Sequence, residues 1–156
     1  LQVVASTSII ADVAAQVEGE RIELTSLMPI GTDPHSFEPT PRDLIALNNA
    51  HIIFLNGLGL EEGLESMLDS LDGDAAIISV NADVAALELD HAAHDHDENG
   101  GDTAHEAEAA EHADENPDHD HGDTDPHTWF SIAVVLEWTN AIEHALRARD
   151  PAHAET

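Results

Sequence analysis

The sequence predicts an α/β fold in which a four-stranded parallel sheet carries helices on both faces. Strand-like and helix-like segments alternate along the chain, an order typical of βαβ units. Residues 52–55 form a continuous apolar run, as expected for a parallel strand that is buried on both faces. With 156 residues, 42% of them hydrophobic, the chain is long enough for one ordinary domain with a genuine core.

The first two strands are separated by a short helix. Val3 and Val4 open the first strand, and a hydroxyl side chain among residues 6–8 can cap the helix that follows. Apolar residues continue at helical spacing until Gly19, where we expect the helix to stop. Residues 21–28 alternate between polar and apolar side chains and form the second predicted strand.

A second helix and the third strand come next. Thr40-Pro41 resembles the start of a capping box with proline at the first helical position, and this helix carries Leu44, Ile45 and Leu47. The third strand, residues 52–55, ends at a glycine-rich turn over residues 56–59. A phosphate-binding loop is an alternative for this turn, but the glycines do not follow the G-x-G-x-x-G spacing and no lysine follows.

The last elements complete the sheet and add one long helix. Residues 61–71 predict a helix and residues 76–80 a fourth strand. Apolar residues from Ile132 to Leu146 mark an amphipathic helix that runs to Arg149, where Asp150-Pro151 interrupts it.

One five-residue pattern, Asp-Pro-His-hydroxyl-aromatic, occurs twice, at residues 33–37 and 125–129. Proline stiffens each corner and places an aspartate beside His35 and His127, and a carboxylate can orient a metal-binding imidazole. The structural alternative is that each Asp-Pro merely begins a helix, with the aspartate as its N-cap. The repetition favours the metal-ligand interpretation, with Zn²⁺ as the preferred ion and Mn²⁺, Fe²⁺, Ni²⁺ and Cu²⁺ as lesser candidates.

Charge and composition exclude several classes of partner. The formal net charge is −29, with four arginines and no lysine, so nucleic acid and anionic membranes would be repelled. The absence of cysteine excludes disulfides and thiolate metal sites. No apolar run approaches the length of a membrane span. Divalent cations are the natural ligands of such a chain.

Residues 90–125 change in character and predict a disordered loop, because the segment has no apolar side chain larger than alanine. We expect this loop to be an accessory, low-affinity collector of divalent ions, although a solvated acidic linker is an alternative. Histidine must be neutral to bind a metal, so collection should weaken below about pH 6.5. The seven histidines of the loop are His91, His94, His96, His105, His112, His119 and His121.

Four segments of the chain resemble the solute-binding proteins of zinc and manganese ABC importers, the group often called cluster A-I. The similarity covers nearly the whole chain outside the loop, and the second segment is the most specific. The segments are Val-Val-Ala-Ser-Thr-Ser-Ile-Ile-Ala-Asp (3–12), Gly-Thr-Asp-Pro-His-Ser-Phe-Glu-Pro-Thr-Pro-Arg-Asp (31–43), Asn-Gly-Leu-Gly-Leu-Glu (56–61) and Asp-Pro-His-Thr-Trp (125–129).

The resemblance implies that the chain is the amino-terminal lobe of a two-lobed, non-enzymatic zinc-uptake protein. It implies that His35 and His127 are the first two metal ligands, that the other ligands belong to a second lobe, and that the loop is of the zinc type. Residues 1–89 and 126–149 would form this lobe, and residues 150–156 would begin the connection between lobes. The resemblance further implies a periplasmic or extracellular location, with an anchor outside this chain, and delivery of the metal to a membrane ABC permease. We expect a monomer.

Three other interpretations remain open at the level of sequence. The protein could be a manganese- or iron-type member of the same group, because the discriminating ligands would lie beyond Thr156. It could be a metal buffer or chaperone that acts through the loop. A metal-dependent hydrolase would need three protein ligands and a general base, and no His-Glu-x-x-His motif is present.

Overall fold

The computed structural model of the protein describes residues 1–68, 71–84 and 124–151. Its centre is a four-stranded sheet in the order β2-β1-β3-β4, and every neighbouring pair is parallel. The predicted α/β class, with four parallel strands, is therefore confirmed. The strands are β1 (Gln2–Ala5), β2 (Glu23–Ser26), β3 (Ile52–Leu55) and β4 (Ala76–Ser79).

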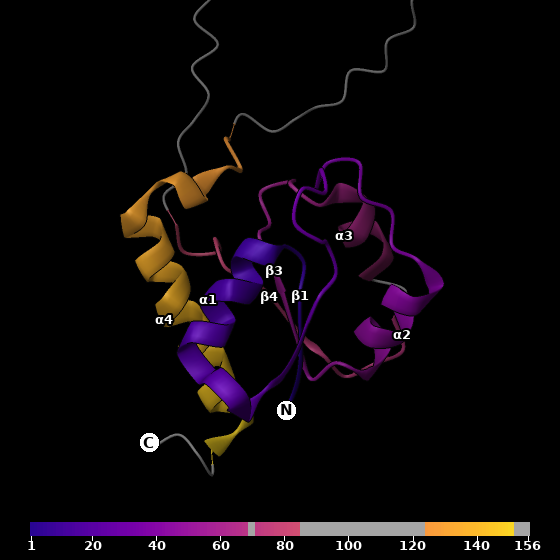
Figure 1. Ribbon diagram of the computed structural model, residues 1–156, viewed down its shortest axis with the longest axis horizontal. Helices are drawn as coiled ribbons and strands as arrows, with labels where there is room; N and C mark the ends of the chain where they lie inside the picture. The colour runs from indigo at the N-terminus through magenta and orange to yellow at the C-terminus, as the bar shows by residue number, and fades with distance from the viewer. Residues whose placement is uncertain (69–70, 85–123, 152–156) are drawn as a thin grey trace, which may run out of the picture.

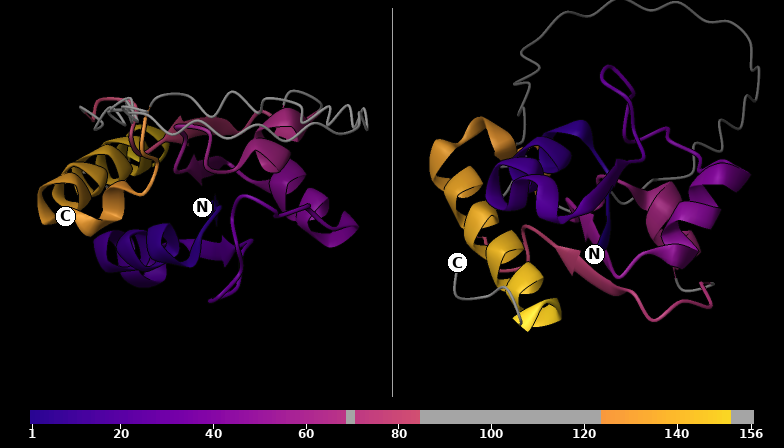
Figure 2. Two further views of the ribbon diagram at one scale, coloured as in Figure 1. Left: turned by 90° about the horizontal axis from the view of Figure 1, so that it is seen from above. Right: turned by 60° about the horizontal axis from the view of Figure 1, so that its bottom comes forward.

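Helices cover both faces of the sheet, two on each side (Figures 1 and 2). Successive residues of β1 face opposite sides of the sheet. Val3 packs on the face covered by the helices of residues 8–18 and 132–149, and Val4 on the face covered by the helices of residues 41–49 and 62–68. Every residue of β3 is buried, which agrees with its continuous apolar sequence. The α-helices are α1 (Ser8–Glu18), α2 (Pro41–Asn49), α3 (Glu62–Leu68) and α4 (Ile132–Arg149), and two 3₁₀ turns are η1 (Gly19–Arg21) and η2 (Thr128–Phe130).

Local sequence signals fix the starts of α1 and α2. Thr7 is the N-cap of α1, and its hydroxyl accepts a hydrogen bond from the backbone N–H of Ile10 at 3.3 Å. At α2 the predicted capping box is present, because Thr40 and Asp43 satisfy each other's backbone N–H groups and Pro41 begins the helix. These caps fix the residues at which α1 and α2 begin.

Some predicted boundaries are wrong by a few residues. The second strand begins at Glu23 rather than at residue 21, because residues 19–21 form the 3₁₀ turn η1. Ile45 lies on the outer side of α2 and is 63% exposed, whereas Leu47 is buried. The predicted loop over residues 90–125 lies outside the described residues, apart from Thr124 and Asp125, and so do residues 152–156.

The carboxyl ends of the strands meet at one edge of the sheet. Ser6 follows β1, Asn56 follows β3, and Asn81 lies just beyond β4, and all three are buried. The first Asp-Pro-His corner lies in the connection from β2 to α2, and the second directly precedes η2. Ligand sites of open parallel sheets occur at such an edge. Among the described helices, none has the length and apolarity needed to cross a membrane.

Candidate metal centre

The two predicted ligands lie close together although 92 positions separate them in the sequence. The ring centroids of His35 and His127 are 5.5 Å apart, with the ring planes tilted by 57°. Each residue is exposed on the surface of the edge where the strands end. The structure therefore brings together the two histidines that the repeated pattern singled out.

The second corner orients His127 through its own aspartate. Asp125 Oδ1 accepts a hydrogen bond from the backbone N–H of His127 at 2.9 Å and lies 2.8 Å from its ring Nδ1. These contacts, the backbone hydrogen bond first, lower the pKa of the Asp125 carboxyl below its ordinary value. An ionised Asp125 favours the tautomer with a proton on Nδ1, which leaves Nε2 free to bind a metal.

The first corner uses its aspartate differently. Asp33 accepts hydrogen bonds from the backbone N–H of His35 and from the Ser36 hydroxyl, both at 3.1 Å. The expected contact between the carboxylate and a histidine ring is thus present at His127, while at His35 the carboxylate supports the backbone of the turn. The alternative of two helix N-caps is wrong at both corners: no helix begins until Pro41 after the first, and His127 itself is the cap of η2 after the second.

Two buried asparagines tie the second corner to the sheet, and sequence reasoning missed both. Asn56 Nδ2 donates to the Pro126 carbonyl at 3.0 Å, and the Thr128 hydroxyl donates to Asn81 Oδ1 at 2.8 Å. The sequence identifies Asn56 only as part of a turn. The available signal was its position, since polar residues directly after buried parallel strands lie where such sheets place their sites.

A buried carboxylate, Glu61, closes the turn that follows β3. It accepts hydrogen bonds from the Ser6 hydroxyl at 2.5 Å, from the Asn56 N–H at 2.9 Å and from the Gly57 N–H at 3.1 Å. Burial raises the pKa of Glu61 above its ordinary value, and these hydrogen bonds oppose that effect. Because the two turn N–H groups already bind a carboxylate, they cannot cradle a phosphate, and the phosphate-loop alternative is wrong.

The turn itself depends on glycine. Gly57 has a φ of +76°, a conformation that L side chains rarely adopt. A Cβ at this position would overlap the Ser79 hydroxyl, which itself donates to the Asn56 carbonyl at 2.9 Å. The absence of a side chain at Gly57 therefore leaves room for the Ser79 hydroxyl, so the ends of β3 and β4 can approach each other closely beside Asn56.

The donor set is incomplete within the described part of the chain. Over residues 1–68, 71–84 and 124–151, no group of three or more His, Asp or Glu side chains is arranged to hold a metal ion. Two imidazoles can bind a divalent ion, while zinc in proteins takes four ligands. The seven loop histidines, from His91 to His121, lie outside the described residues.

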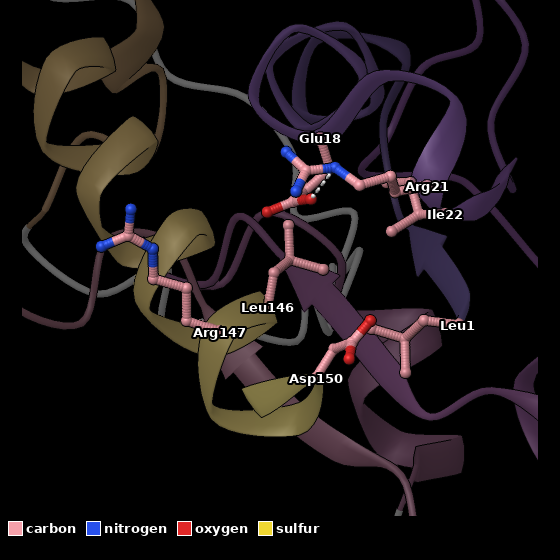
Figure 3. Close-up of a pocket in the computed structure, with 7 residues that line it drawn as sticks. All are labelled: Leu1, Glu18, Arg21, Ile22, Leu146, Arg147 and Asp150. Atoms are coloured by element: carbon pink, nitrogen blue, oxygen red, sulfur yellow. Dashed lines mark ion pairs between the residues drawn. The ribbon is translucent and has the colours of Figure 1, made fainter. Parts of the chain in front are cut away.

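Two hollows of the structure lie away from the histidines. One is a cavity of about 10 Å³ at the opposite edge of the sheet, beside Leu1, Leu146 and the Arg21–Glu18 ion pair (Figure 3). The other is a groove of about 330 Å³ between the end of β4 and α4, which His144 lines. Neither includes His35 or His127. Because both histidines are exposed, an ion bound to both would lie on the exposed strand-end edge.

Comparison with known proteins places the chain among metal-transport components. The family described as "ZnuA: Zinc-uptake complex component A periplasmic" has a model that matches residues 3–156. The manganese-binding lipoprotein MntA of Halalkalibacterium halodurans is 32% identical over 155 residues, which are 99% of this chain and 42% of the relative. The iron ABC transporter substrate-binding lipoprotein MtsA of Streptococcus pyogenes serotype M1 is 34% identical over 156 residues, with 100% and 44% coverage.

A solved structure shows the same architecture. The Mn-bound periplasmic metal binding protein from Candidatus Liberibacter asiaticus superimposes with a TM-score of 0.75 at 25% identity, covering 98% of this chain and 47% of that one. The chain thus spans less than half the length of the proteins it matches. That share agrees with the expectation that it corresponds to one lobe of a two-lobed protein.

Proposed function

The chain belongs to the family of periplasmic zinc-uptake components, and from this premise we propose that it captures a divalent metal ion for delivery to an ABC permease. The family consists of metal-binding components of ABC importers, as the sequence resemblance predicted. In our proposal His35 and His127 are two of the ligands, the remaining ligands come from protein beyond this chain, and the role is transport rather than catalysis.

The observation that carries the proposal is the distance between the two imidazoles. When one tetrahedral zinc ion binds two histidines at about 2.1 Å, their ring centroids lie about 5 Å apart. The observed 5.5 Å between the ring centroids of His35 and His127 is close to that separation. The Asp125 carboxylate supports the same interpretation, because it favours the tautomer that leaves His127 Nε2 unprotonated.

We propose Zn²⁺ as the cargo, with Mn²⁺ or Fe²⁺ as the alternative. Imidazole ligands suit zinc, and the seven loop histidines are an added source of such ligands. The relatives at 32% and 34% identity are named for manganese and iron, which favours the alternative. Their names as lipoproteins support a membrane-anchored location outside the cytoplasm.

The test uses the full chain labelled with ¹⁵N and Zn²⁺ held at fixed free concentrations by a chelator. The protein has two tryptophans and so gives two indole N–H signals. The Trp129 ring is 5.2 Å from that of His127, so its signal reports metal at this site even when the loop also binds zinc. We expect His35→Ala and His127→Ala to raise the free Zn²⁺ needed for half-saturation at least about tenfold.

The matched control is His144→Ala, which removes an exposed histidine of α4 that does not border the centre. It should bind zinc as the unmodified chain does. If all three variants respond at the same free Zn²⁺, the two ligands are wrongly assigned. Repeating the series with Mn²⁺, which broadens nearby signals, determines which cargo the site prefers.

The same samples separate an accessory collector from a metal buffer. A collector adds weak equivalents of zinc, measured by equilibrium dialysis, that persist in His35→Ala and His127→Ala. A buffer that acts only through the loop would take up zinc while the Trp129 signal stays unchanged in every variant. That second result would replace the transport proposal with the chaperone alternative.

A further inference from the structure

We propose that Asn56 and Asn81 are positioning residues that hold His127 at the distance from His35 at which both imidazoles can bind one metal ion. This inference rests on the proposed function and adds to it the group that sets the geometry of the metal centre. Neither asparagine touches the histidine rings in the described structure. They act through the main chain and side chains on either side of His127.

The second corner is held at both flanks of its histidine. On the amino-terminal side, Asn56 Nδ2 donates to the carbonyl of Pro126 at 3.0 Å. On the carboxyl-terminal side, the Thr128 hydroxyl donates to Asn81 Oδ1 at 2.8 Å. Fixing the residues immediately before and after His127 restricts the backbone from which its ring projects.

The two asparagines are also joined to each other and to the core. Asn81 Nδ2 donates to the Asn56 carbonyl at 3.0 Å, which links the ends of β3 and β4. Asn81 Oδ1 accepts a second hydrogen bond, from the indole N–H of the fully buried Trp138 at 2.8 Å. The Asn81 amide therefore has a fixed orientation before the corner binds to it.

Such a fixed link is needed because the two corners pack against opposite layers of the structure. Phe37, at the end of the first corner, packs against the apolar cluster beneath α2 and α3. Trp129, at the end of the second, packs against the cluster beneath α1 and α4. The distance between His35 and His127 therefore depends on how each layer is attached to the strand ends.

The side chain of Asn56 is poorly explained by stability alone. Its Oδ1 atom is buried and has no hydrogen-bond partner in the part of the chain that the structure describes. A buried polar atom without a partner is destabilising, and native structures contain few of them. The residue is explained by its Nδ2 atom, which reaches both the Gly57 and the Pro126 carbonyls at 3.0 Å.

The sharpest test replaces Thr128 with valine, which keeps the shape of the side chain and removes the hydroxyl. Asn81 Oδ1 keeps its bond to Trp138, so no buried acceptor is left unpaired. In buffered Zn²⁺ titrations of the full chain, followed by the Trp129 indole signal, we expect Thr128→Val to raise the half-saturating free Zn²⁺ about tenfold. Thr128→Ser restores the hydroxyl and should return the value to within about twofold of the unmodified chain.

The matched control is Thr139→Val, which removes a hydroxyl that donates to the Val135 carbonyl within α4 at 3.0 Å. A purely structural role predicts that Thr128→Val changes urea stability while zinc binding equals that of the control, and this result would overturn the inference. Asn56→Ala tests the hydrogen bond on the amino-terminal side of His127. It should weaken zinc binding as Thr128→Val does, and unchanged binding in both would likewise refute the inference.

The outcome also separates this inference from the proposed function. If His127→Ala weakens zinc binding and Thr128→Val does not, the ligand assignment stands and the positioning role fails. If His127→Ala has no effect, the proposed function fails, and the positioning role fails with it. The Trp138 indole signal, which reports the bond to Asn81, should stay in place in Thr128→Val.

Discussion

Replacing Glu61 with glutamine should destabilise the protein in a pH-dependent way. The carboxylate serves three buried donors at the strand ends: Oε1 accepts from Ser6 and Asn56, and Oε2 accepts from Gly57. A glutamine has the same shape but only one acceptor oxygen. At least one of the three donors must therefore lose its partner.

The magnitude follows from the donor that is lost. The glutamine oxygen can take the Oε1 position and keep Ser6 and Asn56 bonded, which turns the amide NH₂ toward the Gly57 N–H. A buried donor left without a partner costs about 1–3 kcal/mol. The protonated carboxyl of the natural residue can keep all three bonds, since its O–H can donate to the Ser6 hydroxyl while its oxygens accept the two N–H groups.

The sign of the pH dependence follows from the raised pKa of Glu61 in the folded state. Between the ordinary value of 4.5 and the higher folded value, the folded protein holds more protons than the unfolded chain. The stabilising contribution of this group is therefore complete below pH 4.5 and is lost as the pH rises through the folded pKa. Relative to Glu61→Gln, the natural protein should have its largest advantage, about 1–3 kcal/mol, at the acidic end.

Urea unfolding followed by tryptophan fluorescence from pH 4.5 upward measures this difference. Glu137→Gln is the matched control, because Glu137 is exposed on α4 and its replacement also removes one negative charge. Subtracting the control removes the general effect of the −29 net charge on stability. A difference between Glu61→Gln and the natural protein that is constant with pH, or that grows as the pH rises, would refute the reasoning.

Three further substitutions test the turn, a cap and the core. Gly57→Ala should lower the free energy of unfolding in urea by about 1–3 kcal/mol more than Gly31→Ala does, because both residues have positive φ but only a Cβ at Gly57 would overlap a neighbour. Equal losses of stability in the two variants would contradict this. Thr40→Ala should lower the free energy of unfolding by about 1 kcal/mol, while Thr40→Ser should leave it nearly unchanged. Trp138→Phe removes an indole hydrogen bond from the core and should cost about 1–3 kcal/mol by the same assay, and a neutral result would show that the bond is dispensable.

The strands and helix starts could be predicted because their signals are local. Four consecutive apolar residues at 52–55 are typical of a strand buried on both faces, and the capping box at Thr40 needs no knowledge of the rest of the fold. The start of the second strand could not be read from alternation. Residues 21 and 22 continue the alternating pattern, but the chain is still completing the 3₁₀ turn that ends at Arg21.

That the histidines of the two corners lie at one edge of the sheet could be predicted for a different reason, which is repetition. Two copies of Asp-Pro-His in one chain are a stronger signal than either copy alone, and parallel topology places segments that follow strands at one edge. The different use of the two aspartates could not be predicted. Whether a carboxylate binds a ring, as Asp125 does, or a backbone turn, as Asp33 does, depends on side-chain geometry that five residues of sequence do not determine.

Asn56, Glu61 and Asn81 escape sequence reasoning because each also has an ordinary local explanation. Asparagine before glycine is typical of a turn, and glutamate is common at the start of a helix. All three side chains are buried, and their partners are distant in sequence, as in the bond from Asn56 to the Pro126 carbonyl. Binary patterning assigns polar residues to the surface, so polar groups buried at strand ends are where it fails.

The burial of these groups connects the stability of the core to the geometry of the candidate metal centre. Trp138 is part of the apolar layer beneath α1 and α4, and it shares one acceptor, Asn81 Oδ1, with the threonine that follows His127. A shift of α4 against the sheet would move that acceptor and the corner bound to it. The His35 corner, packed over the other layer, would not follow. The distance between the two histidines is therefore a property of the whole sheet and its two layers, and the repeated pattern supplies the two proposed ligands without fixing how far apart they lie.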